Sequence, residues 1–334
     1  MSLSFQEQQE SALRELQRLE ARIETQSALP EAPLEASAIT IGNFDGVHLA
    51  HKALLETLID ESMKRGVPSV AFTFDPHPAH FLRPEKNTAL LMPIHERIRK
   101  LKAFGIDHVV TLQFNNELAT MCAESFVELV LKSLQPQLFV IGPDTRFGKN
   151  RSGNSELLSK MGKEAGFDVL PMPTLSLKGT KISSSGIRRC LQSGDVTTPR
   201  AWCESPFEIG GSVVPGAGRG RELGFRTANV ESNWPTRPSQ GVYVVRCLFP
   251  DSGSFYGVAN LGTRPTFEDP KVARETLEVH LLDAGAPDLY GKKVQVLFLQ
   301  RLRGEKQFES KESLVEQINR DISHARKVLE KEKQ

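Results

Sequence analysis

The sequence predicts an α/β protein of two domains, in which a parallel β-sheet with intervening helices is followed by an antiparallel β-barrel and a terminal helix. Short apolar, β-branched runs alternate with helical patterns in the first half of the chain. Strand patterns interrupted by Gly and Pro fill the second half, and an amphipathic pattern closes the chain. A length of 334 residues suits about two domains.

The first half contains five runs that predict strands, at Ala38–Ile41, Ser69–Phe74, His108–Leu112, Leu138–Ile141 and Asp168–Pro171. Helical patterns lie between them, near 50–64, 94–104, 123–133 and 154–165. Strictly alternating strands and helices indicate a parallel sheet, whose ligands bind in the loops that follow the strands.

The second half contains strand candidates at Phe207–Val214, Gly241–Leu248, Ser254–Leu261, Thr276–Leu282 and Lys293–Leu299. A helix is expected from about Lys311 with Ser310 as its N-cap. Its apolar stripe predicts core contact and comprises Leu314, Ile318, Ile322, Ala325 and Leu329.

Residues 4–25 predict a further amphipathic helix, which Pro30 and Pro33 separate from the rest. A surface or partner-docking helix without chemistry is its favoured interpretation. We therefore expect a helical extension over 1–34 and domains over 35–195 and 204–331.

Composition excludes several classes of protein. The chain has 42 Lys+Arg against 41 Asp+Glu, so no global positive field recruits nucleic acid or a membrane surface. No apolar run is long enough to cross a bilayer, and residues 1–30 contain no signal-peptide core. The four cysteines form no CxxC pair, which favours a reducing, cytoplasmic location. The sequence carries no signal of oligomeric state.

The loop after the first strand is rich in glycine and enters a helix, an arrangement that favours an anion. His48 and His51 lie three apart and are expected on one face of the first helical turn, where both can donate to phosphate oxygens. Two structural histidines are the plain alternative. A zinc site is a less favoured interpretation, because the Glu of the HExxH motif is missing and the sequence shows no third ligand.

Two more loops carry polar residues that suit phosphate. The segment 142–150 contains Asp144 but fails the GxxxxGK[ST] pattern, since Asn150 replaces the hydroxyl residue. Ser183, Ser184 and Ser185 precede a short helical pattern with Arg188 one turn inside. One interpretation is that the serines only cap the helix. The other is that the serine hydroxyls and the arginine together hold a polyphosphate.

These three segments, in this order, resemble the adenylyltransferase module of prokaryotic bifunctional riboflavin kinase/FAD synthetases. The resemblance rests on GNFDGVH at 42–48 with His51, the IGxDxRFG loop at 141–148 and ISSSxIR at 182–188. It implies a Rossmann-like nucleotidyltransferase fold that joins FMN to ATP and releases pyrophosphate.

The same resemblance implies roles for individual residues. His48, His51 and Arg188 would be catalytic, and TFDPHP at 73–78 would lie near the flavin phosphate and ribityl chain. The residues implied to bind ATP are Gly42, Asn43, Phe44, Asp45, Gly46, Ser183, Ser184 and Ser185. Those implied to bind flavin are Asp75, His77 and Asp144.

Segment 210–229 is rich in Gly and Arg, which suits either phosphate or a solvated loop. It resembles the riboflavin kinase module, with companions at 241–243, 260–266, 278–280 and 288–291. The resemblance implies a six-stranded barrel that phosphorylates riboflavin with ATP. Gly218 and Gly220 would bind ATP, Thr227 and Asn229 would hold Mg²⁺, and Glu278 would act as base.

Three differences from the family pattern, at four positions, keep two alternatives open. Arg226 replaces a proline beside the metal ligands, Ala50 replaces a glycine between the histidines, and Pro143 and Thr145 replace aromatic residues. The alternatives are an adenylyltransferase with a degenerate kinase barrel and a non-catalytic flavin-binding protein.

Overall fold

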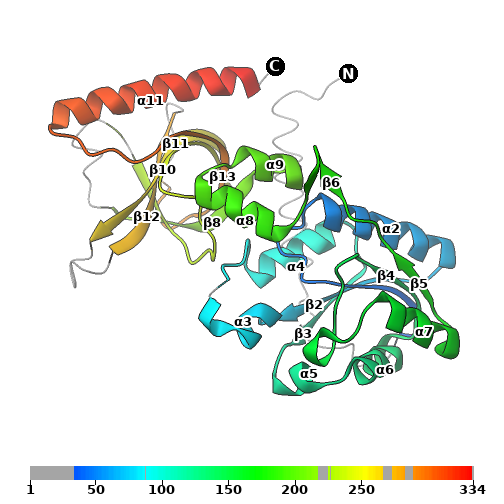
Figure 1. The fold of residues 1–334 in the computed structure, drawn as a ribbon. Coiled ribbons are helices and arrows are strands. Elements are labelled where there is room, and N and C mark those ends of the chain that lie inside the picture. The colour runs from blue at the N-terminus through cyan, green and yellow to red at the C-terminus, as the bar shows by residue number, and fades with distance from the viewer. Residues whose placement is uncertain are drawn as a thin grey trace, which may run out of the picture. The chain divides into compact units, whose positions relative to one another are not determined.

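The computed structural model describes residues 34–86, 88–216, 225, 227–265, 273–282 and 289–332. They form two compact units that divide between Ser184 and Ser185, and each unit is described by itself (Figure 1). The helix expected over 4–25 lies outside the described residues. The domain limits 1–34, 35–195 and 204–331 stay predictions.

The first unit contains a five-stranded sheet in the order β3-β2-β1-β4-β5, and all of its pairings are parallel. The five strands expected from the sequence are confirmed within two residues at each end, and the apolar residues of the four strands other than the edge strand β5 are mostly buried. They are β1 (Ser37–Ile41), β2 (Ser69–Asp75), β3 (His108–Gln113), β4 (Pro136–Ile141) and β5 (Asp168–Pro171).

Helices cover both faces of this sheet (Figure 1). Alternate strand residues pack with α6 (Ala123–Leu134) and α7 (Ser155–Ala165) in one buried cluster that includes Ile39, Phe72 and Phe139. The other face carries α2 (Leu49–Arg65) and α4 (Ile94–Ala103). Shorter elements not expected from the sequence are α3 (Pro78–Leu82), η1 (Pro84–Lys86), α5 (Asn116–Thr120), η2 (Lys149–Arg151), β6 (Ser176–Leu177) and β7 (Thr180–Lys181).

The strand order places a topological switch point at β1. The chain leaves β1 to reach β2 on one side, and β4 pairs with β1 on the other side. Connections that depart in opposite directions leave a crevice beyond the carboxyl ends of the strands, where α/β proteins bind ligands. The loop after β1 and the loop after β4, both singled out from the sequence, begin at this crevice.

The second unit is built on a closed six-stranded antiparallel barrel in the order β10-β11-β12-β9-β8-β13 (Figure 1). Five strands match the expected ones: β8 (Phe207–Val214), β10 (Gly241–Phe249), β11 (Gly253–Pro265), β12 (Ala273–Leu281) and β13 (Lys293–Arg303). The closed barrel confirms the six strands that the resemblance implied. The strand pattern did not locate the sixth strand, β9 (Thr227–Glu231), because it is short and follows the Gly- and Arg-rich segment directly. It pairs with β12 and β8 and closes the barrel.

Among the described residues, this unit has three helices. α8 (Ser184–Ser193) and α9 (Thr197–Cys203) precede the barrel, and Ser239 N–H donates to the Leu191 carbonyl (2.8 Å). α11 (Lys311–Glu332) begins as expected, with Ser313 N–H donating to the Ser310 hydroxyl (3.2 Å).

The apolar stripe of α11 divides into two parts. Ala325 and Leu329 are buried against the barrel with Val244 and Leu299, as expected for core residues. Leu314, Ile318 and Ile322 are only half-buried and line a cavity, so the interpretation of the whole stripe as core was wrong. Periodicity shows that a helix face is apolar, but it does not distinguish a filled core from the wall of a binding cavity.

Candidate functional sites

The loop after β1 holds the two histidines in an unusual backbone path. Phe44, Gly46 and Val47 have positive φ angles of 48°, 90° and 40°, and two of these residues carry side chains that make the conformation costly. The Phe44 ring is buried under the loop and packs edge-on against His51, with 5.3 Å between centroids. A Cβ at Gly42 would lie 2.9 Å from that ring, so Gly42 allows the close packing.

His48 and His51 lie face to face at the start of α2. His48 is the N-cap residue and His51 is in the first turn, and the two rings stack with 3.7 Å between centroids. Burial lowers the pKa of His48 to about 4. Burial, the neighbouring His48 and Arg97 hold the pKa of His51 well below 6.5. Both rings are therefore neutral at physiological pH in the unliganded protein.

Asp45 and Ser184 fasten this loop to its surroundings. The buried Asp45 carboxylate accepts from Leu91 N–H (2.9 Å), and the Asp45 carbonyl accepts from the Ser184 hydroxyl (2.7 Å). The structure thus brings the first and third predicted segments together through Ser184. Asn43 and Gly46 complete the loop, and the roles of all these residues toward ATP stay predictions.

The residues predicted to bind flavin follow β2 and β4. Asp75 is exposed at the end of β2, whereas His77 is buried and its Nδ1 accepts from Ala79 N–H (3.0 Å) as the cap of α3. Asp144 lies after β4 and forms an ion pair with Lys181. Ser183 is half-buried just before α8, and Ser185 and Arg188 continue along that helix in the second unit.

Arg97 of α4 is a site residue that the sequence analysis missed. It is 1% exposed, and its Nη1 donates to the Thr73 hydroxyl and the Phe74 carbonyl at the carboxyl end of β2, both at 3.4 Å. Charged residues in an amphipathic helix are usually solvated, so its position in the sequence gave no signal. Its burial becomes visible only when α4 packs on the sheet.

A cavity of about 370 Å³ lies between the barrel and α11, and its volume is within the range that small organic ligands occupy. Part of its wall is apolar and part is polar. The apolar part consists of Phe225, Val242, Val258, Phe308, Leu314, Ile318 and Ile322. The polar part consists of Thr227, Asn260, Glu278, His280, Arg303, Glu305, Lys306 and Asp321.

Strand pairing brings the predicted kinase residues together. Glu278 of β12 lies opposite Asn229 of β9, and His280 lies opposite Thr227. Residues opposite each other in an antiparallel pair, and those two apart on one strand, share a face. Thr227, Asn229 and Glu278 therefore face the same side of the barrel wall, and Thr227 and Glu278 line the cavity.

The side-chain amide of Asn229 lies close to the backbone at Gly216. A Cβ at Gly216 would lie 1.9 Å from Asn229 Nδ2, so only glycine fits at that point of the chain. Three residues singled out from the sequence lie outside the described residues: Gly218, Gly220 and Arg226, which differs from the family pattern. No cluster of three or more His, Cys, Asp or Glu side chains suited to a metal occurs in the described part of the chain.

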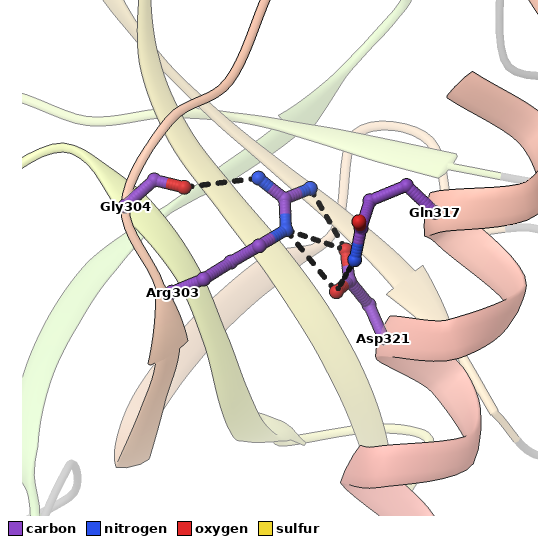
Figure 2. A network of polar contacts seen from close by, with 4 residues as sticks. All are labelled: Arg303, Gly304, Gln317 and Asp321. Carbon is purple, nitrogen blue, oxygen red and sulfur yellow. Dashed lines mark hydrogen bonds and ion pairs between the residues drawn. The ribbon is translucent and has the colours of Figure 1, made fainter. Parts of the chain in front are cut away.

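An ion pair fixes α11 beside the cavity (Figure 2). Arg303 at the end of β13 donates from Nε and Nη2 to the buried carboxylate of Asp321, at 2.8–3.1 Å. Gln317 donates to the same carboxylate (2.9 Å), and the Arg303 guanidinium lies 5.8 Å from the centre of the Phe308 ring. The two-pronged geometry holds the cavity-lining half of α11 against the barrel.

Comparisons with known proteins agree with this arrangement of two sites. Residues 31–186 match the family model of FAD synthetase, and residues 203–329 match the model of riboflavin kinase. A bifunctional riboflavin kinase/FMN adenylyltransferase from Escherichia coli K12 is 40% identical over 89% of this chain and 94% of its own. The chain belongs to the bifunctional riboflavin kinase/FMN adenylyltransferase family.

Other family members and a solved structure extend the comparison. The Pseudomonas fluorescens enzyme of the same name is 39% identical over 86% of this chain and 91% of its own. A crystal structure of a Streptococcus pneumoniae protein named a macrolide-efflux protein has a TM-score of 0.81 and 28% identity, covering 90% and 97% of the two chains. The printed name describes the Streptococcus pneumoniae protein and is not carried over to this chain. Within the described ranges of this family member, no helix is long and apolar enough to cross a membrane.

The low pKa of His48 predicts a pH dependence of stability. An unfolded histidine binds its proton below about pH 6.5, whereas folded His48 does so only near pH 4. The free energy of unfolding should therefore fall as the pH drops from about 6.5 toward 4, by up to about 1.4 kcal/mol per pH unit from this residue. Substitution His48→Asn removes this contribution.

Urea unfolding of both proteins between about pH 5 and pH 7, followed by circular dichroism, measures the effect. The free energy of unfolding of the wild type should fall more steeply with decreasing pH than that of His48→Asn. Parallel curves would show that the pKa of folded His48 is not lowered from the value of about 6.5 in the unfolded chain.

Proposed function

We propose that this chain performs two successive ATP-dependent steps, phosphorylation of riboflavin to FMN in the barrel and adenylylation of FMN to FAD in the parallel-sheet unit. The observation that carries the proposal is the barrel cavity, in which a carboxylate and a hydroxyl face an apolar wall. A flat, apolar isoalloxazine ring with a polyhydroxyl chain needs such a division. The membership of the chain in the family supports both steps.

In the kinase step, Glu278 accepts the proton of the ribityl 5′-hydroxyl. The hydroxyl oxygen then forms a bond to the γ-phosphorus of ATP, and the bond from that phosphorus to the ADP oxygen breaks. The protein positions the hydroxyl in line and removes its proton, which is most of what phosphoryl transfer requires of side chains. Arg303 and Asp321 hold α11 and its three apolar residues at the flavin side of the cavity.

Thr227 and Asn229 fit the Mg²⁺ that accompanies ATP. They offer a hydroxyl and an amide oxygen on one face of β9, beside the cavity. Mg²⁺ prefers oxygen ligands and is usually held by one or two protein groups together with phosphates and water. When bound, it would neutralise charge on the phosphates of ATP.

In the adenylylation step, a phosphate oxygen of FMN attacks the α-phosphorus of ATP, and the bond to the pyrophosphate leaving group breaks. His48 and His51 are neutral, so each ring carries one N–H that can donate to a phosphate oxygen. Their positions beyond β1 at the switch point suit a nucleotide phosphate. Arg188, Ser183 and Ser184 would hold the departing phosphates, and Asp75, His77 and Asp144 would lie toward the flavin.

We further propose that the protein works in the cytoplasm. Cys122, Cys190 and Cys247 are free thiols, which suits a reducing compartment.

The proposed function is tested by incubating the purified protein with Mg-ATP and either riboflavin or FMN, and separating the flavins by chromatography. FAD should form from both, and chelation of the metal should stop both steps. FAD from FMN alone would show that the barrel no longer phosphorylates and that Arg226 marks a degenerate kinase. No product from either flavin would favour a binding protein.

Substitution His48→Ala should lower the rate of FAD formation from FMN by at least about tenfold, which corresponds to about 1.4 kcal/mol of transition-state stabilisation. FMN formation from riboflavin should be unchanged, because the barrel has its own site. His95→Ala, at an exposed position of α4, is the control and should leave both rates unchanged. Equal loss of both activities in His48→Ala would contradict the assignment of two sites.

Substitution Glu278→Gln should have the opposite pattern, with FMN formation lowered at least about 100-fold and FAD formation from FMN retained. Glutamine keeps the size of the side chain but cannot accept the proton. Glu275→Gln on the same strand is the matched control, since Glu275 pairs with Arg237 at 3.3 Å and does not line the cavity. Undiminished kinase turnover in Glu278→Gln would remove Glu278 from the role of base.

A further inference from the structure

Polar side chains without partners gather on the face of the parallel sheet that α4 covers. The buried side-chain nitrogen and oxygen atoms that have no hydrogen-bond partner in the described part of the first unit belong to Thr40, His48, His51, Arg97 and Thr111. Thr40, Thr73 and Thr111 lie one each on the neighbouring strands β1, β2 and β3, and Thr73 is level with Thr111. By strand alternation they point away from the apolar cluster around α6.

Arg97 is the charged member of this group. Its guanidinium is among the largest fully buried side chains of the described residues, yet it makes only two hydrogen bonds, each at the long limit of 3.4 Å. Both come from Nη1, and the Nε–H has no partner. Guanidinium groups buried for structural reasons usually pair with a carboxylate in two-pronged fashion, and Arg303 with Asp321 shows that arrangement in this same chain.

The charged groups around Arg97 do not fully compensate its positive charge, so the site favours an anion. Asp45 and Asp75 are near enough to favour its charged form, but burial outweighs them and lowers its pKa from the ordinary value. The Asp45 carboxylate is engaged by Leu91 N–H, and Asp75 is exposed. His51, the other titratable neighbour, is held neutral in part by Arg97 itself. Arg97 is thus the cation that this group of residues offers to a ligand.

We propose that Arg97 binds a phosphate group of a substrate of the adenylylation step, with its free Nε–H and the neighbouring histidines as donors. The proposal rests on the proposed adenylyltransferase function and adds a residue to it. Leaving a buried donor of a charged group unsatisfied costs a protein stability. Such a cost is typical of binding sites, where the ligand supplies the missing partner.

The phosphate can come from FMN or from ATP, and both present the same oxygen atoms. Arg97 reaches the end of β2, and the segment 73–78 that continues from there is the one expected near the flavin phosphate. The histidines lie at the end of β1, where the nucleotide is expected. Measuring the Michaelis constants for FMN and for ATP distinguishes the two sources.

The test compares Arg97→Met, which keeps an unbranched apolar stem and removes the guanidinium and its charge, with Arg97→Lys, which keeps the charge. Arg99→Met is the matched control on the same helix, because Arg99 pairs with Glu96 at 2.6 Å. The kcat/KM for FAD formation should fall at least about 100-fold in Arg97→Met and less in Arg97→Lys. It should stay within about twofold of wild type in Arg99→Met.

Michaelis constants then identify the source of the phosphate. A selective rise in KM for FMN would assign Arg97 to the flavin phosphate, and a selective rise for ATP would assign it to the nucleotide. Circular dichroism and the thermal unfolding described below report that the parallel-sheet unit of each variant is folded, since FMN formation from riboflavin reports only on the barrel. Wild-type protein that makes no FAD would refute the proposed function, whereas FAD formation by Arg97→Met equal to that by Arg99→Met would refute only this inference.

Thermal unfolding without ligand separates binding from a structural role. If Arg97 awaits a phosphate, Arg97→Met should melt at the wild-type temperature or above it, because an apolar side chain has no unsatisfied donor. ATP and FMN should raise the melting temperature of Arg97→Met less than that of wild type. A lower melting temperature in both Arg97 variants, with equal loss of FAD formation in the two, would make Arg97 a structural residue and overturn the proposal.

Discussion

The path of the chain on either side of β1 is the constraint on which the first site depends. Because β2 and β4 flank β1, the connections diverge and the carboxyl end of β1 opens into a crevice. The loop that crosses it must turn at once into α2, and it does so through positive φ angles at Phe44, Gly46 and Val47. Phe44 fills the space beneath the turn, and this packing presses the two histidine rings together and out of water.

The two sites solve opposite electrostatic problems. We propose that the sheet site binds phosphates: its groups include two neutral histidines and the buried Arg97 cation, and its buried Asp45 carboxylate accepts from Leu91 N–H. The barrel site must take a proton from an alcohol, and it places a carboxylate in a partly apolar cavity. Each environment would weaken the chemistry of the other, which is a physical reason to keep the two reactions in separate units.

The sequence predicted those features that depend on local pattern. Strands such as Ser69–Asp75 are continuous apolar runs, and loops after them carry the conspicuous glycines and histidines. Features that arise from tertiary packing were missed. Strand β9 is too short to show a pattern, Arg97 has the spacing of a solvated helix residue, and Ile318 has the spacing of a core residue but lines a cavity. Burial and partner choice are properties of the folded chain, so single-sequence patterns do not contain them.

Discrimination between the two flavins follows from the same unsatisfied groups. Riboflavin and FMN share the ring and the ribityl chain, so an apolar pocket alone would separate them poorly. A site that buries Arg97 without a full set of partners penalises riboflavin, since that ligand would exclude water from the guanidinium and offer no phosphate in return. FMN supplies the missing acceptor. If the ligand of Arg97 is the flavin phosphate, Arg97 adds selectivity for FMN to an order of reactions that the chemistry already sets, because riboflavin has no phosphate oxygen to attack ATP.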